Sequence, residues 1–329
     1  MQPLVSIFCT AYNQAPYIEK TLQGFVSQNT TFPFEVIVHD DASSDGTQDI
    51  IGRYSLKYPE IIKPVLQEEN QYSKGISLLN SILLPRATGK YIAMCEGDDF
   101  WVDDNKLQRQ FDFLEQHRDY SLVLHNAYIY DYRYDIVYLS EPMESDCDKT
   151  LGDIAIEGGG LLNPTASMFF RRQLFDHALA GPVGDHFIML ELASKGKVRW
   201  FSDPMSVYRF HASNSWSVSK KAESGESIRK YTQRYIDALR AADDYSGRDY
   251  HDAFVRRIKM QREFERKDLL KCGAPNLDIE GWGFSVESVA MSIRRHMPQG
   301  VEKALGRAAC IKKKKRESLF VGTMREFCG

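Results

Sequence analysis

The amino-terminal part of the chain alternates short apolar runs with amphipathic stretches of helical period. The apolar runs predict strands at residues 4–9, 34–38 and 91–95. Apolar residues three or four positions apart predict helices at about 16–26, 45–56, 77–84 and 106–115. Strands and helices that alternate in this order indicate a mostly parallel sheet with helices on both faces.

Beyond residue 120 the pattern is less regular. Further strands are predicted at 121–124, 165–170 and 205–210, with a helix at 185–195 and an aromatic-rich hairpin at 128–139. Gly158-Gly159-Gly160 predicts a flexible loop. From Ser219 onward the chain is polar and helical in pattern. We therefore expect one large α/β domain over residues 1–218 and a mainly helical extension over residues 219–329.

Composition is that of an ordinary globular protein, with 43% hydrophobic and 26% charged residues. The six cysteines are scattered and include no Cys-x-x-Cys pair, which argues against a disulfide framework or a zinc knuckle and indicates a reducing compartment. The first residues lack the pattern of a signal peptide, and no apolar run approaches the roughly 20 residues that span a bilayer. We therefore expect a cytoplasmic protein.

The net charge of −3 hides an asymmetry between the two parts of the chain. Residues 219–329 contain 24 Lys and Arg against 16 Asp and Glu, whereas residues 1–218 contain 18 basic and 29 acidic residues. The acidic body is a poor host for a diphosphate unless a metal cation mediates. The basic tail, with its run from Lys312 to Arg316, leaves three roles open: peripheral contact with an anionic membrane at its inner face, a homo-oligomer interface, or an acceptor lid. We expect no nucleic-acid partner.

Polar clusters follow three of the predicted strands. They are Thr10-Ala11-Tyr12-Asn13, His39-Asp40-Asp41 and Glu96-Gly97-Asp98-Asp99. Ligands of open α/β sheets bind at the carboxyl ends of strands, so these clusters mark a candidate site. No glycine-rich phosphate loop follows the first strand. Carboxylates that hold a hard divalent cation, which in turn holds a diphosphate, are the other solution.

Three motifs, in this order and spacing, resemble those of glycosyltransferase family 2, and in particular members of the bacterial surface-polysaccharide type. They are Val5-Ser6-Ile7-Phe8-Cys9-Thr10-Ala11-Tyr12-Asn13, Val38-His39-Asp40-Asp41-Ala42-Ser43-Ser44-Asp45-Gly46-Thr47 and Gly89-Lys90-Tyr91-Ile92-Ala93-Met94-Cys95-Glu96-Gly97-Asp98-Asp99. The resemblance covers roughly residues 3–216. It implies a GT-A fold, which is Rossmann-like with a mostly parallel mixed sheet, and an inverting transfer reaction.

The resemblance also implies roles for the nucleotide site. Thr10 and Tyr12 would line the nucleoside pocket, with Tyr12 against the base, and Ala11 and Asn13 would belong to the same nucleotide-sugar site. Asp40 and Asp41 would contact the base edge or the ribose. Glu96 stands where the family more often has Asp, and it would join Asp98 in the nucleotide-sugar site.

The metal would be Mg²⁺ or Mn²⁺, and the resemblance implies Asp98 and Asp99 as its ligands. His211, in Tyr208-Arg209-Phe210-His211, resembles a family position near the metal or the diphosphate, and a neutral imidazole suits Mn²⁺.

Asp185, in Gly184-Asp185-His186, resembles the family's catalytic carboxylate, although many members have Glu-Asp there. A base at this point would remove the proton of an acceptor hydroxyl as its oxygen attacks C1 of the sugar, so the anomeric configuration inverts. Capping of the helix that starts here is the competing interpretation of Asp185. Glu191 and Asp203 are the next candidates for the base.

We therefore expect non-processive transfer from a nucleotide-diphosphate sugar, by family habit a UDP-sugar, to a glycan or lipid-linked oligosaccharide. Processive synthases tend to carry Gln-x-x-Arg-Trp and membrane spans, but here Gly196 stands at the Gln position before Arg199-Trp200. A nucleotidyltransferase would show a glycine-rich, basic loop after the first strand, which Thr10 to Gln14 does not match. The third alternative is a non-catalytic nucleotide-sugar-binding module.

Overall fold

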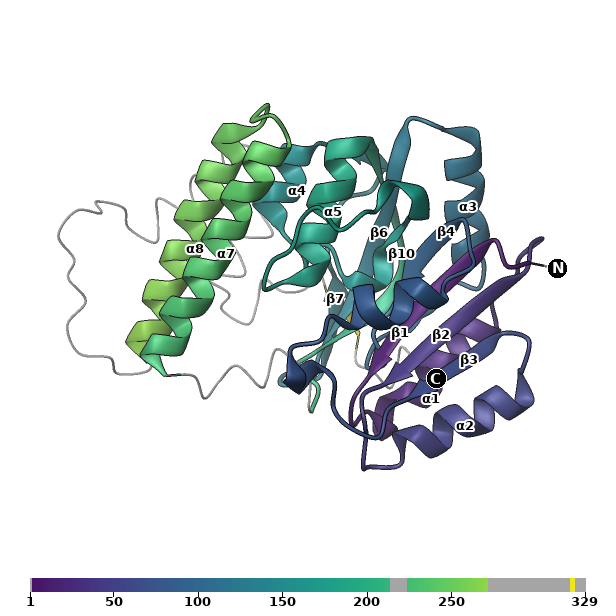
Figure 1. Ribbon diagram of the computed structural model, residues 1–329. Helices are drawn as coiled ribbons and strands as arrows, with labels where there is room; N and C mark the ends of the chain where they lie inside the picture. Colours follow the sequence, from purple (N-terminus) through teal and green to yellow (C-terminus); the bar gives the residue numbers. More distant parts are fainter. Residues whose placement is uncertain (1, 214–223, 272–319, 323–329) are drawn as a thin grey trace.

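The computed structural model describes residues 2–213, 224–271 and 320–322, and its strands form one mixed sheet of eleven strands within these ranges (Figure 1). The strands are β1 (Val5–Ala11), β2 (Phe34–Asp40), β3 (Ile62–Leu66), β4 (Tyr91–Met94), β5 (Phe100–Trp101), β6 (Tyr120–Asp131), β7 (Ile136–Leu139), β8 (Cys147–Lys149), β9 (Phe169–Arg171), β10 (Lys197–Phe210) and β11 (Phe320–Gly322). Their order is β11-β7-β6-β9-β4-β1-β2-β3, and β10 pairs with β5, β6 and β8.

The parallel half of the sheet is β4-β1-β2-β3. Its apolar strands are connected through α1 (Ala15–Val26) and α2 (Thr47–Lys57), and α3 (Lys106–Gln116) follows the acidic loop after β4. Pro16 lies in the first turn of α1, where its missing N–H is no loss. Ile18, Leu22 and Phe25 bury the apolar face of this helix, and its packing fixes where the loop after β1 begins.

The second half of the sheet is mixed. β9 runs antiparallel to both β4 and β6, and β6 and β7 form an antiparallel hairpin. β10 runs parallel to β6 with register shifts near Pro204, and it returns toward the acidic loop by pairing with β5. Two helices cover this half, α4 (Leu151–Glu157) and α5 (Gly184–Lys195). Thr150 and Asp153 close a capping box at the start of α4.

Side chains that alternate along the strands form a separate apolar core on each face of the sheet. On β9, Phe169 packs in one core and Phe170 in the other. The core of Phe170 also contains Tyr235 of α7 (Gly225–Tyr245) and Phe254 of α8 (His251–Lys271). The two carboxyl-terminal helices lie side by side against α4 and α5 (Figure 1), so they share a hydrophobic core with the body.

The predicted fold class, an α/β sheet with flanking helices and a helical carboxyl-terminal region, is confirmed, but several elements differ. Residues 77–84 form a π-helical turn, Leu78–Leu83, and then a 3₁₀ turn, Leu84–Arg86, because Pro85 lacks an N–H to continue a helix. The strand predicted at 165–170 is only Phe169–Arg171, since Pro164 opens a 3₁₀ turn before it. The predicted hairpin is confirmed as β6 and β7.

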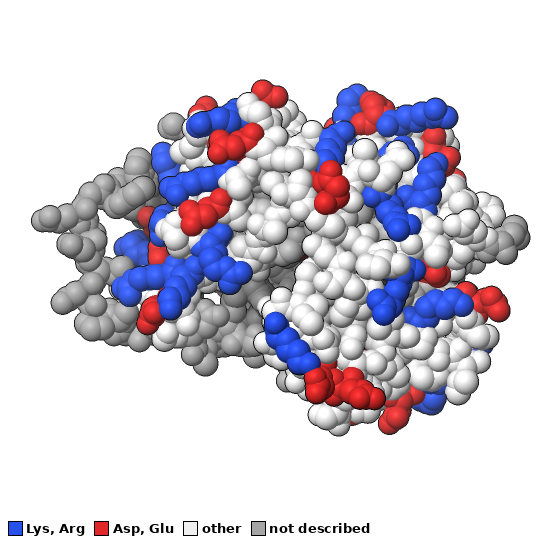
Figure 2. All heavy atoms as spheres, in the orientation of Figure 1, with Lys and Arg blue, Asp and Glu red and all other residues white. Residues whose placement is uncertain are grey.

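Charges of both signs are interleaved over α7 and α8 (Figure 2). No helix of the described residues is long and apolar enough to cross a membrane. The predicted division at residues 218 and 219 and the basic run from Lys312 to Arg316 lie outside the described residues. The division into two domains and the role of the tail stay predictions.

Candidate active site

The strand register brings the three predicted polar clusters to one edge of the sheet. Thr10 pairs with His39 and Ala11 with Asp40, so β1 and β2 end side by side. The backbone N–H of Gly97 donates to the carbonyl of Thr10 at 2.9 Å, which places the acidic loop after β4 against the end of β1. A Cβ on Gly97 would lie 2.4 Å from Gln14 Oε1, so a larger residue there would displace the Gln14 side chain.

The loop after β1 presents a large aromatic side chain. Tyr12 is 48% exposed at the end of the strand, whereas Ala11 is buried. Asn13 adopts a left-handed conformation, with φ of 51°, and its side-chain oxygen accepts from the backbone N–H of Ser44 at 2.9 Å. The loop is thus fixed against the loop after β2, and the phenol of Tyr12 is left accessible to a ligand.

Asp40 and Asp41 are buried, and both carboxylates are engaged by donors of the protein itself. Asp40 accepts from the backbone N–H of Ser43 at 2.9 Å and from the Gln48 side chain at 2.7 Å. Asp41 accepts from the backbone N–H groups of Gln71 and Tyr72 at 2.7 and 3.1 Å. These bonds provide the compensation that buried carboxylates need. They also tie the loop around Gln71 to the end of β2.

The acidic loop after β4 contains three carboxylates in different surroundings. Asp99 is almost fully buried; its Oδ1 accepts from the backbone N–H of Arg209 at 2.8 Å, and its Oδ2 has no hydrogen-bond partner. Burial raises the pKa of Asp98, and the nearby Arg209 guanidinium partly offsets this. The same guanidinium donates to the carbonyl of Asp98 at 2.5 Å. Arg209 therefore partly neutralises an otherwise anionic loop.

Asp185 comes from the other half of the molecule and faces the same cluster. Burial raises the pKa of Glu96 to about 8, and repulsion from Asp98 and Asp185 adds to the rise. Burial also raises the pKa of Tyr208, and all four carboxylates (Asp99, Glu96, Asp98 and Asp185) add to this rise. These effects on Glu96 and Tyr208 indicate that Asp185 lies near the acidic loop after β4.

Asp185 lies in the first turn of α5, and the N-cap position is Val183. Its Oδ2 accepts from the backbone N–H of Gly160 at 3.2 Å, and its Oδ1 accepts from that of His186 at 2.8 Å. Burial raises the pKa of Asp185 despite these bonds. The next candidate bases are engaged elsewhere. Glu191 is fully buried and accepts from the backbone N–H groups of Asp176 and Leu179, while Asp203 pairs with Arg109 at 2.7 Å.

The predicted metal ligands are not brought together as a complete cage. Within the described ranges, no group of three or more His, Cys, Asp or Glu side chains has the arrangement of a metal site. His211 Nδ1 lies 3.1 Å from Asp131 Oδ1, and its Nε2 lies 3.1 Å from a guanidinium nitrogen of Arg133. Since both ring nitrogens are engaged, His211 could bind a metal through Nε2 only if Arg133 moved away.

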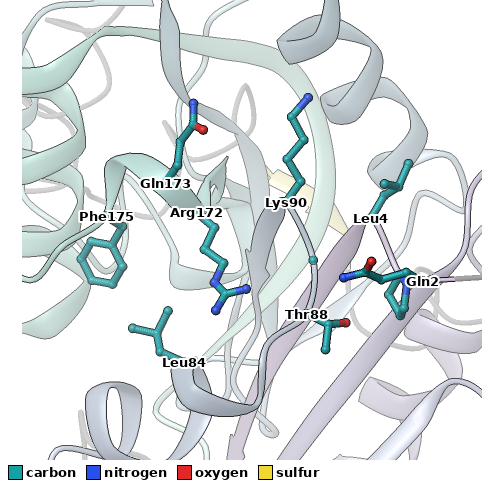
Figure 3. Close-up of a pocket in the computed structure, with 10 residues that line it drawn as sticks. Gln2, Leu4, Leu84, Thr88, Lys90, Arg172, Gln173 and Phe175 are labelled. Carbon is teal, nitrogen blue, oxygen red and sulfur yellow. The ribbon is translucent and has the colours of Figure 1, made fainter.

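A cavity of about 720 Å³ lies at the opposite edge of the sheet, before β1 and β4 (Figure 3). Its polar lining includes Thr88, Lys90 and Arg172, and Leu84 and Phe175 supply apolar surface. It contains none of the predicted site residues. The acidic cluster and this cavity are therefore separate features of the fold.

Sequence reasoning missed two kinds of functional residue here. Arg209 lies two residues before His211, the residue predicted from this segment, and its positive charge is the signal that points to acidic partners. The run Gly158-Gly159-Gly160 predicts only a flexible loop, but a Cβ on Gly159 would lie 2.2 Å from Asp185 Oδ2. That contact depends on the tertiary fold, and no local pattern predicts it.

Comparison with known proteins agrees with this geometry. The family model described as Glycosyl transferase family 2 matches residues 6–179, which is more than half of the chain. The chain belongs to glycosyltransferase family 2. The predicted family is thus confirmed, and so is the predicted enzyme class, glycosyltransferase. The matched range contains the clusters after β1, β2 and β4 but ends before Asp185 and His211.

Curated relatives cover part of the chain. The uncharacterized protein Rv1520 of Mycobacterium tuberculosis is 34% identical over 215 residues, which are 64% of this chain and 60% of the relative. The Escherichia coli protein named UDP-Glc:alpha-D-GlcNAc-diphosphoundecaprenol beta-1,3-glucosyltransferase WfaP is 38% identical over 112 residues, 34% of this chain and 41% of the relative. The aligned segments thus span 60% and 41% of these relatives, less than two thirds of each.

Solved structures share the fold over most of the chain. TarS of S. aureus in complex with UDP-GlcNAc aligns with a TM-score of 0.61 at 18% identity, covering 93% of this chain and 83% of TarS. The mannosyltransferase PcManGT of Pyrobaculum calidifontis, in complex with GDP-Man and Mn²⁺, aligns with a TM-score of 0.53 at 18% identity, covering 96% and 83%. At this identity the likeness establishes the GT-A fold of the family 2 domain and no more.

Proposed function

We propose that this family 2 domain transfers a sugar, with inversion, from a UDP-sugar to a hydroxyl of a glycan or lipid-linked oligosaccharide. The transfer is non-processive and depends on Mg²⁺ or Mn²⁺. The observation that carries the proposal is the convergence of Asp185 from α5 with Glu96 and Asp98 from the loop after β4. A donor-side acidic cluster and a separate carboxylate opposite it are the two parts that a single displacement requires.

The relatives support the choice of substrates. WfaP is named for UDP-Glc as donor and a diphosphoundecaprenol-linked sugar as acceptor, and TarS is solved with UDP-GlcNAc. We extend the chemistry of these names, a uridine nucleotide sugar and a glycan hydroxyl, to this chain. The exposed Tyr12 at the end of β1 offers an aromatic face to the base.

The residues after β4 fit a divalent cation. Asp99 Oδ2 is a buried carboxylate oxygen without a hydrogen-bond partner in the structure, and the partly exposed Asp98 lies beside it. Hard divalent cations prefer such oxygen ligands. The described residues alone do not complete a coordination shell, so the diphosphate of the donor would supply the remaining oxygens. When bound, the ion would neutralise charge on the departing nucleoside diphosphate.

The protein's own residues have separate tasks in the transfer. Asp185 accepts the proton of the acceptor hydroxyl while the acceptor oxygen bonds to C1 of the sugar. The bond from C1 to the nucleoside diphosphate breaks on the opposite face, and the diphosphate leaves with the electron pair. The N–H groups of Gly160 and His186 hold the carboxylate in place. Its raised pKa makes it a better proton acceptor than an exposed aspartate.

Asp185→Asn tests this assignment directly. Asparagine keeps the size of the side chain but cannot accept the proton, so we expect donor turnover to fall by about 100-fold or more. Binding of UDP with Mn²⁺ should stay within about twofold, because the substitution removes no side chain that we propose to hold the nucleotide or the metal. Turnover of UDP-glucose and UDP-GlcNAc, as transfer or as hydrolysis by water, is measured with calorimetric binding in parallel. Full turnover by Asp185→Asn would move the base to another residue.

A further inference from the structure

The carboxyl-terminal helices reach the catalytic segment through a chain of hydrogen bonds. Tyr235 Oη of α7 lies 2.6 Å from His186 Nδ1, directly after Asp185. Arg257 of α8 donates from Nη2 to Tyr235 Oη at 2.9 Å and from Nη1 to the carbonyl of Ile156 at 3.0 Å. Tyr235 and His186 are buried, so these bonds form in a medium that strengthens them.

The direction of each bond follows from the acceptors present. His186 Nε2 lies 3.0 Å from the carbonyl of Ile154, which can only accept, so Nε2 carries the proton. Burial lowers the pKa of His186 to about 3, so the ring is neutral and Nδ1 is an acceptor. The hydroxyl of Tyr235 therefore donates to His186, while its oxygen accepts from Arg257. With these donors and acceptors, Arg257, Tyr235 and His186 each have one protonation state.

The same arginine supports the glycine loop that touches the base. A Cβ on Gly158 would lie 2.9 Å from Arg257 Nη2, so the guanidinium packs directly on this residue. The next residue, Gly159, approaches the carboxylate of Asp185, and the N–H of Gly160 donates to it. Arg257 thus reaches Asp185 by two routes, through Tyr235 and His186 on one side and through the glycine loop on the other.

The charged and titratable groups around Asp185 come from several elements. Glu96, which itself feels the charge of Asp98, interacts with Asp185 from the loop after β4, and Tyr208 interacts with it from β10. Tyr235 lies behind it on α7, and its neighbour His186 is neutral. The Arg257 guanidinium lowers the pKa of the Asp185 carboxyl, against the larger effect of burial.

We propose that Arg257 and Tyr235 are positioning residues for transfer, which hold the Asp185 segment and the glycine loop in catalytic geometry from the carboxyl-terminal helices. The inference rests on the proposed role of Asp185. The proposal gives α7 and α8 an indirect role in the reaction. Tyr235 and Arg257 hold the segment that carries Asp185, and the substrate itself is bound by other residues.

Three substitutions at two positions test the proposal in the whole chain, with Mn²⁺ and a range of UDP-sugar concentrations up to saturation. Tyr235→Phe keeps the ring and its packing but removes the hydroxyl, and we expect kcat to fall about tenfold, the rate equivalent of one hydrogen bond, with the donor KM unchanged. Arg257→Gln should lower kcat further and move the acid limb of the kcat pH profile to higher pH. Arg257→Lys keeps the charge and should restore the position of that limb.

Arg262→Gln is the matched control. Arg262 also joins α8 to α7, since it donates to the Gln233 side chain at 2.7 Å. It takes no part in the hydrogen bonds that lead from Arg257 through Tyr235 to His186. It should leave kcat and the acid limb unchanged. Wild-type kcat and pH profile in Tyr235→Phe and Arg257→Gln would overturn the positioning roles. Failure of the proposed function looks different, because the wild-type protein would then turn over no donor. If Arg257→Gln does not fold, Tyr235→Phe and Arg257→Lys decide.

Discussion

The backbone N–H of Arg209 donates to Asp99 Oδ1 at 2.8 Å and so fastens β10 to the acidic loop after β4. The side chain of Arg209 lies over the ring of Phe100, 4.4 Å from its centroid, and donates to the carbonyl of Asp98. One residue of β10 thereby holds the carboxylate of Asp99 and the backbone of Asp98, the two residues that we propose as metal ligands. The geometry of the donor site depends on a strand that is distant in sequence.

Arg209→Met should therefore weaken the site without removing any carboxylate. Losing a charge-assisted, buried hydrogen bond lowers the free energy of unfolding by about 2 kcal/mol. The pKa of Asp98, which the Arg209 charge holds down, rises further, so its carboxylate forms only at higher pH. We expect the midpoint of the pH dependence of Mn²⁺-UDP binding to move upward, as measured by calorimetry. Arg209→Lys should retain the midpoint, and an unchanged midpoint in Arg209→Met would contradict the argument.

Gly159→Ala tests the contact between the glycine loop and the proposed base. A Cβ at this position would lie 2.2 Å from Asp185 Oδ2, so the carboxylate must move. A displacement of about 1 Å reduces a positioned reaction by about 100-fold, and we expect that loss in kcat with unchanged UDP binding. The control is Gly184→Ala, next to Asp185, where a Cβ meets nothing within 4 Å. Equal kcat in the two variants would argue against the assignment of Asp185.

Asp41→Ala distinguishes two roles of the Asp41 carboxylate, which are to anchor the loop around Gln71 and to contact the nucleoside. The carboxylate of Asp41 accepts from the N–H groups of Gln71 and Tyr72, and removing it leaves two donors without their partner. We expect the free energy of unfolding to fall by about 2 kcal/mol in urea titrations. The exposed Asp49 of α2 supplies the control, Asp49→Ala, which should be neutral within about 0.5 kcal/mol. Unchanged stability with lost UDP binding would show that Asp41 serves the nucleoside alone.

Lys106 predicts a pH dependence of stability. It is fully buried in α3, and burial lowers its pKa to about 7. Between about pH 7 and 10 the unfolded lysine stays protonated while the folded one loses its proton, so the unfolded state binds more protons and stability rises with pH. The slope approaches at most about 1.4 kcal/mol per pH unit. Groups such as Glu96, whose pKa is raised to about 8, contribute in the opposite direction and equally in both proteins. Urea unfolding at pH 7, 8 and 9 should therefore show a more positive slope in the wild-type protein than in Lys106→Met; equal slopes would contradict it.

The sequence predicted those parts of the fold and site that depend on local pattern. Continuous apolar runs marked β1, β2 and β4, because strands buried on both faces read that way, and their polar ends marked the acidic edge. β3 was missed, since Lys63, Pro64 and Leu66 are exposed or interrupt the apolar pattern. The support of Asp185 by Arg257 joins residues 72 positions apart in sequence, and no periodicity or motif reports such a contact.

Calorimetric titration of UDP into the full-length chain tests most directly whether the acidic edge of the sheet binds a diphosphate through a divalent cation. The account predicts binding with MnCl₂, no measurable binding in EDTA, and loss of the Mn²⁺-dependent binding in Asp98→Asn, which stays folded by circular dichroism. Equal UDP affinity with and without Mn²⁺, or in Asp98→Asn and the wild-type protein, would contradict it.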